Sequence, residues 1–264
     1  YKILRIITLG KTNPICLRYR WYYYYRYLVA VLNLASTSPA RNLFIKDPLS
    51  SNLGLKLLEE SARMLGEDGF DAFTLKKLAH NLQTTESSVY RYFDNKHRLL
   101  VYHINLYWEW LNQEVHTHCY QKGLQGRNAL DRAFEIMCFP QANNWPKDGI
   151  TYECMHKILT HQSVKAYFSS YVDIENKDGA HRALKTLVQR LSEWLHEEAP
   201  EFDFPKSLIN TLLTSVMMQP FYAEHLPSLT ELPSPKPTDT QTAEQTYRYV
   251  CQILDRLTTP TRIA

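Results

Sequence analysis

The chain has 264 residues, of which 44% are hydrophobic and 22% charged, a composition typical of a globular protein that is long enough to bury a core. Its formal net charge is +3, but residues 1–45 hold seven of the 30 Lys and Arg residues and no acidic one, so the remainder carries 23 basic against 27 acidic side chains. A chain that binds nucleic acid through overall basicity is therefore excluded, and any basic surface must be local.

The five cysteines are scattered and form no CxxC pair, which favours free thiols in a reducing cytoplasm over a disulfide framework. No apolar run reaches the roughly 18 residues that a membrane span needs. His116, His118 and Cys119 lie close in sequence, but residues i and i+2 point to different sides of a helix. We therefore expect a cytoplasmic protein without a metal site, a cofactor or a membrane partner.

Residues 1–48 are expected to form an irregular or poorly ordered extension, with little packed structure before Leu49. Four tyrosines follow one another at 22–25, neither amphipathic period is sustained, and the first methionine in the chain is Met64, inside an expected helix. Three interpretations stay open. The segment could be an export signal, because Tyr27–Ala35 with its upstream arginines resembles one. It could also be translated from upstream of the native start, or be a basic arm that contacts the DNA backbone.

Residues 49–98 predict three short helices. The first begins near Ser50, Ser51 or Asn52, which are good N-cap residues, and ends at Gly66 or Gly69. Thr74 caps the second, and the third runs from Thr84 or Thr85 to about Tyr92. The inward-facing residues at helical spacing are Leu55, Leu58, Ala62, Leu65, Leu75, Leu78, Ala79, Leu82, Val89 and Phe93.

These helices carry a resemblance. The stretch GFDAFTLKKLAHNLQTTESSVYRYFDNKHRLL, residues 69–100, is similar to the DNA-binding domain of the tetracycline-repressor (TetR) family. The matching positions are Gly69, Phe70, Ala72, Thr74, Leu78, Ala79, Thr85, Ser88, Val89, Tyr90, Phe93, Lys96, Leu99 and Leu100. One departure is Gln83, which stands where the family usually has Gly in the turn, so a left-handed conformation there would cost on the order of 1 kcal/mol.

The resemblance implies a helix-turn-helix whose third helix enters the major groove. The hydroxyls of Thr84, Thr85, Ser87 and Ser88 are short enough to let the backbone approach phosphates. The helices that start at Thr74 and Thr85 present free N–H groups and a positive dipole end, which favour phosphate binding. Lys76 faces outward beside them.

Individual roles on DNA differ. Tyr90 and Lys96 resemble the family's backbone-contacting positions, which set register without reading sequence. Arg91 and Tyr92 are the candidates for base contact, and Glu86 is able to accept a hydrogen bond from cytosine.

Residues 99–264 predict further helices and no strand. A linking helix runs from Lys96, capped by Asn95, to about His118, and the next covers Arg127–Phe139. The remaining expected helices are 150–160, 163–172, one through 184–195 that ends near Pro200, 205–225 with Pro220 as a kink, and 242–257. Leu226–Asp239 contains four prolines and is expected to be a surface linker. The fold class is therefore all-α, with a three-helix helix-turn-helix domain followed by a helical regulatory domain.

In the resembled family the second domain binds a small molecule, and its last two long helices pair with a second subunit. The resemblance thus implies double-stranded DNA, a second copy of the chain and a small-molecule effector as partners. The expected pocket residues are Tyr107, Trp110, Phe134, Met137, Tyr152, Met155, Phe168 and Trp194. The expected dimer-interface residues are Ile209, Leu213, Val216, Met217, Tyr247, Val250 and Leu254.

The function expected is a sequence-specific transcriptional regulator, a ligand-responsive repressor that binds a palindromic operator as a dimer. The alternative is a helical adaptor or a nonspecific DNA-binding protein without small-molecule control. An enzyme is not expected, because the chain has no G-x-S-x-G, no HExxH and no phosphate-binding glycine loop, and its Glu153–His156 pair has no second such pair.

Overall fold

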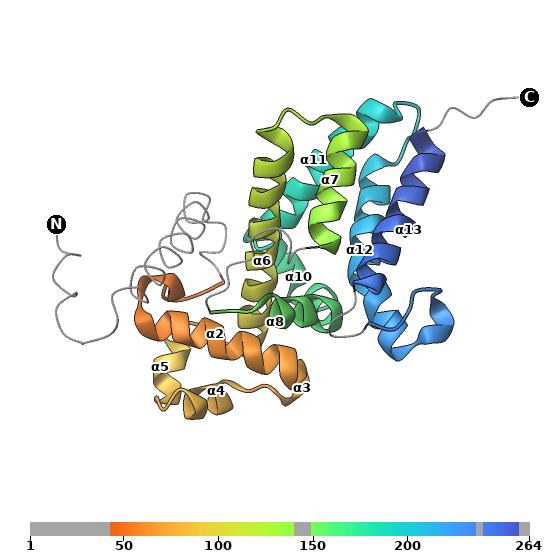
Figure 1. Cartoon of the computed structure of the whole chain (residues 1–264). Coiled ribbons are helices and arrows are strands. Elements are labelled where there is room, and N and C mark those ends of the chain that lie inside the picture. Colours follow the sequence, from red (N-terminus) through yellow and green to blue (C-terminus); the bar gives the residue numbers. More distant parts are fainter. Residues whose placement is uncertain (1–42, 140–148, 236–239, 259–264) are drawn as a thin grey trace, which may run out of the picture.

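A computed structural model describes residues 43–139, 149–235 and 240–258, and every regular element in them is helical. The all-α prediction is confirmed. In Figure 1 a group of short helices forms the lower end of the molecule, and longer helices stand above it as a bundle. We refer to η3 and α2–α5 as the head and to α6–α13 as the body.

The head contains the expected helices with small differences in their bounds. It consists of the 3-10 helix η3 (Pro48–Ser50), α2 (Asn52–Glu67), α3 (Gly69–Ala72), α4 (Leu75–Asn81) and α5 (Glu86–Tyr90). Their inner faces are apolar and pack into one core, which explains why such short helices are stable.

The N-caps predicted from the sequence are present. The Ser51 hydroxyl accepts a hydrogen bond from Gly54 N at 3.2 Å and thereby caps α2. Thr74 Oγ1 accepts from Lys77 N at 3.1 Å, and Thr85 Oγ1 accepts from Ser88 N at 3.2 Å. Each cap satisfies an N–H group that has no partner within its own helix.

Residues 43–48 are packed, contrary to the expectation of little structure before Leu49. Leu43 and Pro48 are buried, and Ile45 N donates to Tyr92 O at 2.8 Å. The sequence carried no amphipathic signal here because the segment packs mainly as an irregular strap. The expectation for residues 1–42 lies outside the described residues.

Helix α6 (Lys96–Val115) continues into the π-helix η4 (His116–Tyr120) and connects the head to the body. Asn95 caps it as predicted, since its Oδ1 accepts from Arg98 N at 2.9 Å. Residues 99–105 are all buried because α6 contacts the head on one side and other helices of the body on the other. A tilt of α6 would therefore move the head relative to the body.

The body continues with shorter and longer helices. They are α7 (Gly126–Cys138), α8 (Tyr152–Lys157), the π-helix η6 (Ile158–Gln162), α9 (Ser163–Tyr167), α10 (Val172–Lys177), α11 (Arg182–Glu198), α12 (Pro205–His225), the 3-10 helix η7 (Pro227–Leu229) and α13 (Gln241–Thr258). Helix 163–172 was expected in one piece, but α9 ends at Tyr167 and α10 was not predicted. Pro220 lies inside α12, which continues through it.

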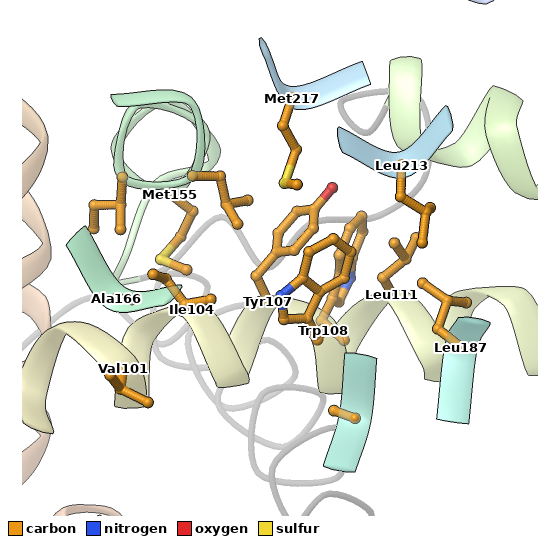
Figure 2. Close-up of a cluster of buried hydrophobic side chains, with 14 of the residues drawn as sticks. Val101, Ile104, Tyr107, Trp108, Leu111, Met155, Ala166, Leu187, Leu213 and Met217 are labelled. Carbon is orange, nitrogen blue, oxygen red and sulfur yellow. The ribbon is translucent and has the colours of Figure 1, made fainter. Parts of the chain in front are cut away.

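The apolar core is continuous from the head into the body. Figure 2 shows Tyr107 and Leu111 of α6 projecting toward Met217 and Leu213 of α12, with Met155 of α8 beside Ile104. Trp108 adds a polar contact, because its Nε1 donates to Tyr167 Oη at 2.7 Å. This packing holds α6 against the other helices of the body.

A second set of contacts joins the head to the body through α8, η6 and α9. Helix α8 lies along α2, and η6 contacts α3 (Figure 1). Gln162 Oε1 accepts from Phe70 N at 3.2 Å, and Lys165 forms an ion pair with Asp71. The segment 152–165 therefore contacts the head directly, a connection that the sequence did not predict.

Candidate nucleic-acid interface

The turn between α4 and α5 is a Schellman motif. Gln83 N donates to His80 O at 3.0 Å, and Thr84 N donates to Ala79 O at 2.9 Å. Gln83 occupies the position that glycine usually fills, with φ 51°, and no other non-glycine residue of the described part of the chain has a positive φ. The left-handed conformation anticipated at Gln83 is therefore present.

Hydroxyl groups gather at the start of α5. Thr85 Oγ1 lies 2.9 Å from Ser87 Oγ and 2.8 Å from Ser88 Oγ. Thr85 and Ser87 are exposed, whereas Thr84 and Ser88 are half-buried. These side chains keep the first turn of α5 small and polar, which permits close approach of another molecule's backbone.

The outward surface of α5 is polar and aromatic. Glu86, Tyr90 and Arg91 are exposed, and Tyr90 leaves 46% of its surface accessible. Val89, on the opposite side, is fully buried and anchors the helix to the head. Thr74 and Lys76, at the start of α4, are exposed as expected. The structure thus places most of the expected DNA-binding residues on the surface of α4 and α5 or immediately beside them.

Tyr92 is different, and the prediction that it faces outward is wrong. Helix α5 ends at Tyr90, and the Tyr92 side chain turns inward until 3% of its surface is accessible. Its hydroxyl lies 2.8 Å from Ser51 Oγ and 3.4 Å from Lys46 Nζ. Burial acts to raise the pKa of the Tyr92 phenol, but these hydrogen bonds and the positive charges of Lys46 and Arg91 together lower it below its ordinary value. Tyr92 thus fastens residues 46–51 to the end of α5 and does not reach a base.

Lys96 is committed to contacts inside the head. Its Nζ donates to Phe70 O at 2.9 Å and Phe73 O at 3.2 Å, and lies 4.4 Å from the centre of the Phe70 ring. The ammonium group therefore satisfies carbonyls at the end of α3. Any contact of Lys96 with DNA would have to be made in addition to these bonds.

Two helices joined by a tight turn, with the second anchored by an apolar side and exposing a polar one, define a helix-turn-helix protein of the DNA-binding class. The family model of the bacterial regulatory proteins of the tetR family matches residues 57–102, from α2 to the first turns of α6. No curated protein matches the chain. The match assigns this part of the chain to the DNA-binding domain of tetR-family transcription regulators.

The residues expected to line an effector pocket are mostly packed in the core. Six of them lie on the body helices with little exposure: Tyr107, Trp110, Phe134, Met137, Met155 and Trp194. Phe168 leaves 87% of its surface accessible, so its assignment to a pocket is wrong. Tyr152 is half-buried and lies 2.9 Å, through its hydroxyl, from His156 Nδ1. Aromatic residues at helical spacing here fill the interior.

A pocket of about 340 Å³ lies instead between α2 and the start of α8. Its lining combines charged and apolar groups: Lys56, Glu59, Glu60, Arg63, Leu82, Gly149, Ile150, Thr151 and Cys154. Arg63 pairs with Glu60 at 2.7 Å on its wall, and Arg63 lowers the pKa of the Glu60 carboxyl. None of the eight expected lining residues belongs to this pocket.

The residues expected at a dimer interface are also largely internal. Ile209, Leu213, Val216 and Met217 of α12 and Val250 and Leu254 of α13 are buried within a single chain, and Tyr247 is half-buried. A surface that binds a second subunit must be accessible in the single chain. The assignment of these six buried residues to the dimer interface is therefore wrong. Helices α12 and α13 pack against each other and against α11 and α7, which the apolar spacing alone could not distinguish from pairing between subunits.

The described residues include no helix long and apolar enough to cross a membrane.

Proposed function

We propose that the protein is a sequence-specific transcriptional repressor that binds a near-palindromic operator as a homodimer and responds to a ligand. Helix α5 would enter the major groove, with Arg91 and Glu86 contacting base edges. Tyr90, Lys76 and the hydroxyls of Thr85 and Ser87 would contact the DNA backbone and set the register.

The observation that carries this proposal is the contrast between the two sides of α5. Val89 is fully buried and holds the helix in the head, while Arg91 and Tyr90 are exposed next to the polar first turn. A recognition helix requires this combination, because base contacts need side chains on a rigidly held and accessible helix.

A single helix of this length reads only a few base pairs, so we propose pairing through the outward sides of α12 and α13. Thr211 and Thr214 of α12 and Tyr249 of α13 are exposed there. The Thr211 and Thr214 hydroxyls donate to the carbonyls of Ser207 and Asn210, which lowers the polarity of that surface. Two heads would then lie about one helical turn apart on the DNA.

The pocket between α2 and α8 is the proposed effector site. A ligand there would touch Glu60 and Arg63 of the head and Ile150 and Cys154 of the body. The ligand would change operator affinity only if it bound with unequal affinity to two arrangements of head and body, one that can bind DNA and one that cannot.

Selection of bound sequences from a random duplex library tests the proposal. We expect an enriched inverted repeat whose half-sites are about 10 base pairs apart, and binding of two chains to each duplex. Recovery of unenriched sequence with strongly salt-dependent binding would identify a nonspecific DNA-binding protein, and failure to retain DNA would identify an adaptor.

A further inference from the structure

The ligand atoms of His161 in η6 and of Glu224 and His225 in α12 lie close together, although His161 precedes Glu224 by 63 positions in the chain. His161 Nε2 is 3.1 Å from His225 Nε2 and 4.0 Å from Glu224 Oε2. His225 Nε2 is 3.8 Å from the same carboxylate oxygen. Among the described residues this is the group of three His, Cys, Asp or Glu side chains close enough to share an ion.

The three separations suit one small cation. The point equidistant from three atoms so spaced lies about 2.1 Å from each, which falls within the usual range of Zn–N and Zn–O bond lengths. Two imidazoles and one carboxylate are also a donor set that zinc and similar divalent metals prefer.

A neighbouring hydroxyl favours one tautomer of His161. Thr160 Oγ1 can donate its proton to His156 O at 2.8 Å, which leaves its oxygen in place to accept from His161 Nδ1 at 2.7 Å. With the proton on Nδ1, the lone pair of His161 Nε2 points toward His225 and Glu224. Metal-bound histidines are held in this way by a partner on the other ring nitrogen.

The helix α12 presents its two ligands on one side. Glu224 and His225 follow Phe221 at i+3 and i+4, so the three side chains share a helix face. The Phe221 ring centre lies 5.1 Å from that of His161 and 4.7 Å from that of His225. Phe221 therefore limits the rotation of both imidazoles and supports the site from its apolar side.

We propose that His161, Glu224 and His225 bind a divalent transition-metal ion, for which zinc is the best match. Their side chains retain 27%, 48% and 43% of their exposure, so solvent reaches the site and a fourth position is open to water or to an exchangeable ligand. No metal site was expected from the sequence, because no local spacing pattern connects residue 161 with residues 224 and 225.

The proposed metal site lies next to the segment that contacts the head. Gln162, the residue after His161, accepts from Phe70 N of the head, and α12 is the helix proposed to face the partner subunit. A bound ion would fix η6 to the C-terminal end of α12 (Figure 1) and so restrict the segment that contacts the head. This consequence rests on the proposed function, whereas metal binding does not.

Calorimetric titration of the purified full chain with zinc tests the site. We expect one ion per chain, with affinity at least 100-fold lower in both His161→Ala and His225→Ala. His196→Ala, at an exposed histidine near the end of α11, is the matched control and should bind as the wild type does. Equal affinity in all four proteins, or no zinc binding, would overturn the proposal and leave an ordinary hydrogen bond between the two histidines.

Two further measurements distinguish zinc binding at this site from binding by the cysteines, and a weaker site from a less stable protein. Cobalt substituted for zinc should give a visible spectrum without a thiolate charge-transfer band, and such a band would assign the ion to the free cysteines instead. Thr160→Val should lower zinc affinity by about 10–100-fold at unchanged melting temperature of the metal-free protein, while Thr160→Ser should restore it. Equal zinc affinity in Thr160→Val and the wild type would contradict the positioning role.

The effect on the head is measured separately as operator affinity with zinc and with a chelator. A change that disappears in His161→Ala would support the connection through η6. Zinc binding without any change in operator affinity would overturn that connection and leave the metal site intact, and failure of DNA binding altogether would concern only the proposed function.

Discussion

Gln83 is held in a left-handed conformation by the turn between α4 and α5, with φ 51°. A side chain in this region costs roughly 1–2 kcal/mol, while glycine tolerates it but loses more entropy on folding. We therefore predict that Gln83→Gly raises the free energy of unfolding by about 0.5–1 kcal/mol. Chemical denaturation of both proteins measures this.

The matched control is Gln121, an exposed glutamine at the end of η4 with φ −65°. Gln121→Gly should lower stability by about 0.5–1 kcal/mol, because the native backbone there suits any residue. A loss of stability in Gln83→Gly as large as that in Gln121→Gly would show that the turn is not strained.

For single residues, the sequence predicted the features that depend on neighbouring residues in the chain, namely the helix caps and the turn. Thr74, Thr85 and Asn95 were found from their cap positions, and Gln83 from the missing glycine. Tyr92 was misplaced because helical periodicity was extended past Tyr90, where the helix ends. The inward turn of Tyr92 depends on Ser51, which is 41 positions away and leaves no trace in the local pattern.

Helices α2 and α6 meet at a buried polar contact that ties the head to the body. His103 Nε2 lies 2.8 Å from Ser61 Oγ, and neither residue has accessible surface. Burial lowers the pKa of His103 from its ordinary 6.5 to about 3. Between these two values the unfolded chain binds a proton that the folded protein excludes, so stability is full above pH 6.5 and falls as the pH drops toward 3.

We predict that His103→Gln removes about one proton from the pH dependence of unfolding, or about 1.4 kcal/mol per pH unit below pH 6. The remaining slope includes His156, whose pKa burial lowers to about 4. Denaturation at pH 7.0, 6.0 and 5.0 measures the difference. His80→Gln, at an exposed position of α4, is the control and should keep the wild-type slope.

If His103→Gln and the wild type lose stability in parallel as the pH falls, His103 is accessible to protons in the folded state and the α2–α6 contact is loose.

The helices of the body were predicted largely from amphipathic spacing, and most bounds agree within a few residues. Spacing could not tell which apolar face meets another helix of the same chain, so Leu213 and Val250 were assigned to a subunit interface although both are internal. The same limitation placed core aromatics such as Phe134 in a pocket. The contacts of 152–165 with the head depend on long-range packing and were not predictable.

The whole molecule is proposed to act as a dimer through the outer side of α12. We predict that Thr214→Glu converts the dimer to a monomer of unchanged helicity, because it places a charge on the exposed side of that helix. Sedimentation velocity measures the mass. Thr186→Glu, at an exposed threonine of α11, is the control and should remain dimeric.

The neighbouring Leu213→Ala provides the contrast, because Leu213 is 1% exposed and belongs to the core. It should lower the free energy of unfolding by about 2–5 kcal/mol. A dimeric Thr214→Glu protein would exclude this side of α12 as the interface.

Helix α5 is proposed to read DNA sequence, and the ratio of the affinities for the selected operator and for a scrambled duplex tests this most directly. Lys76→Ala, on the exposed side of α4, should weaken binding to both duplexes by a similar factor. Arg91→Ala should reduce the ratio itself by about 5- to 150-fold, corresponding to about 1–3 kcal/mol at one base pair. An unchanged ratio in Arg91→Ala would contradict the account.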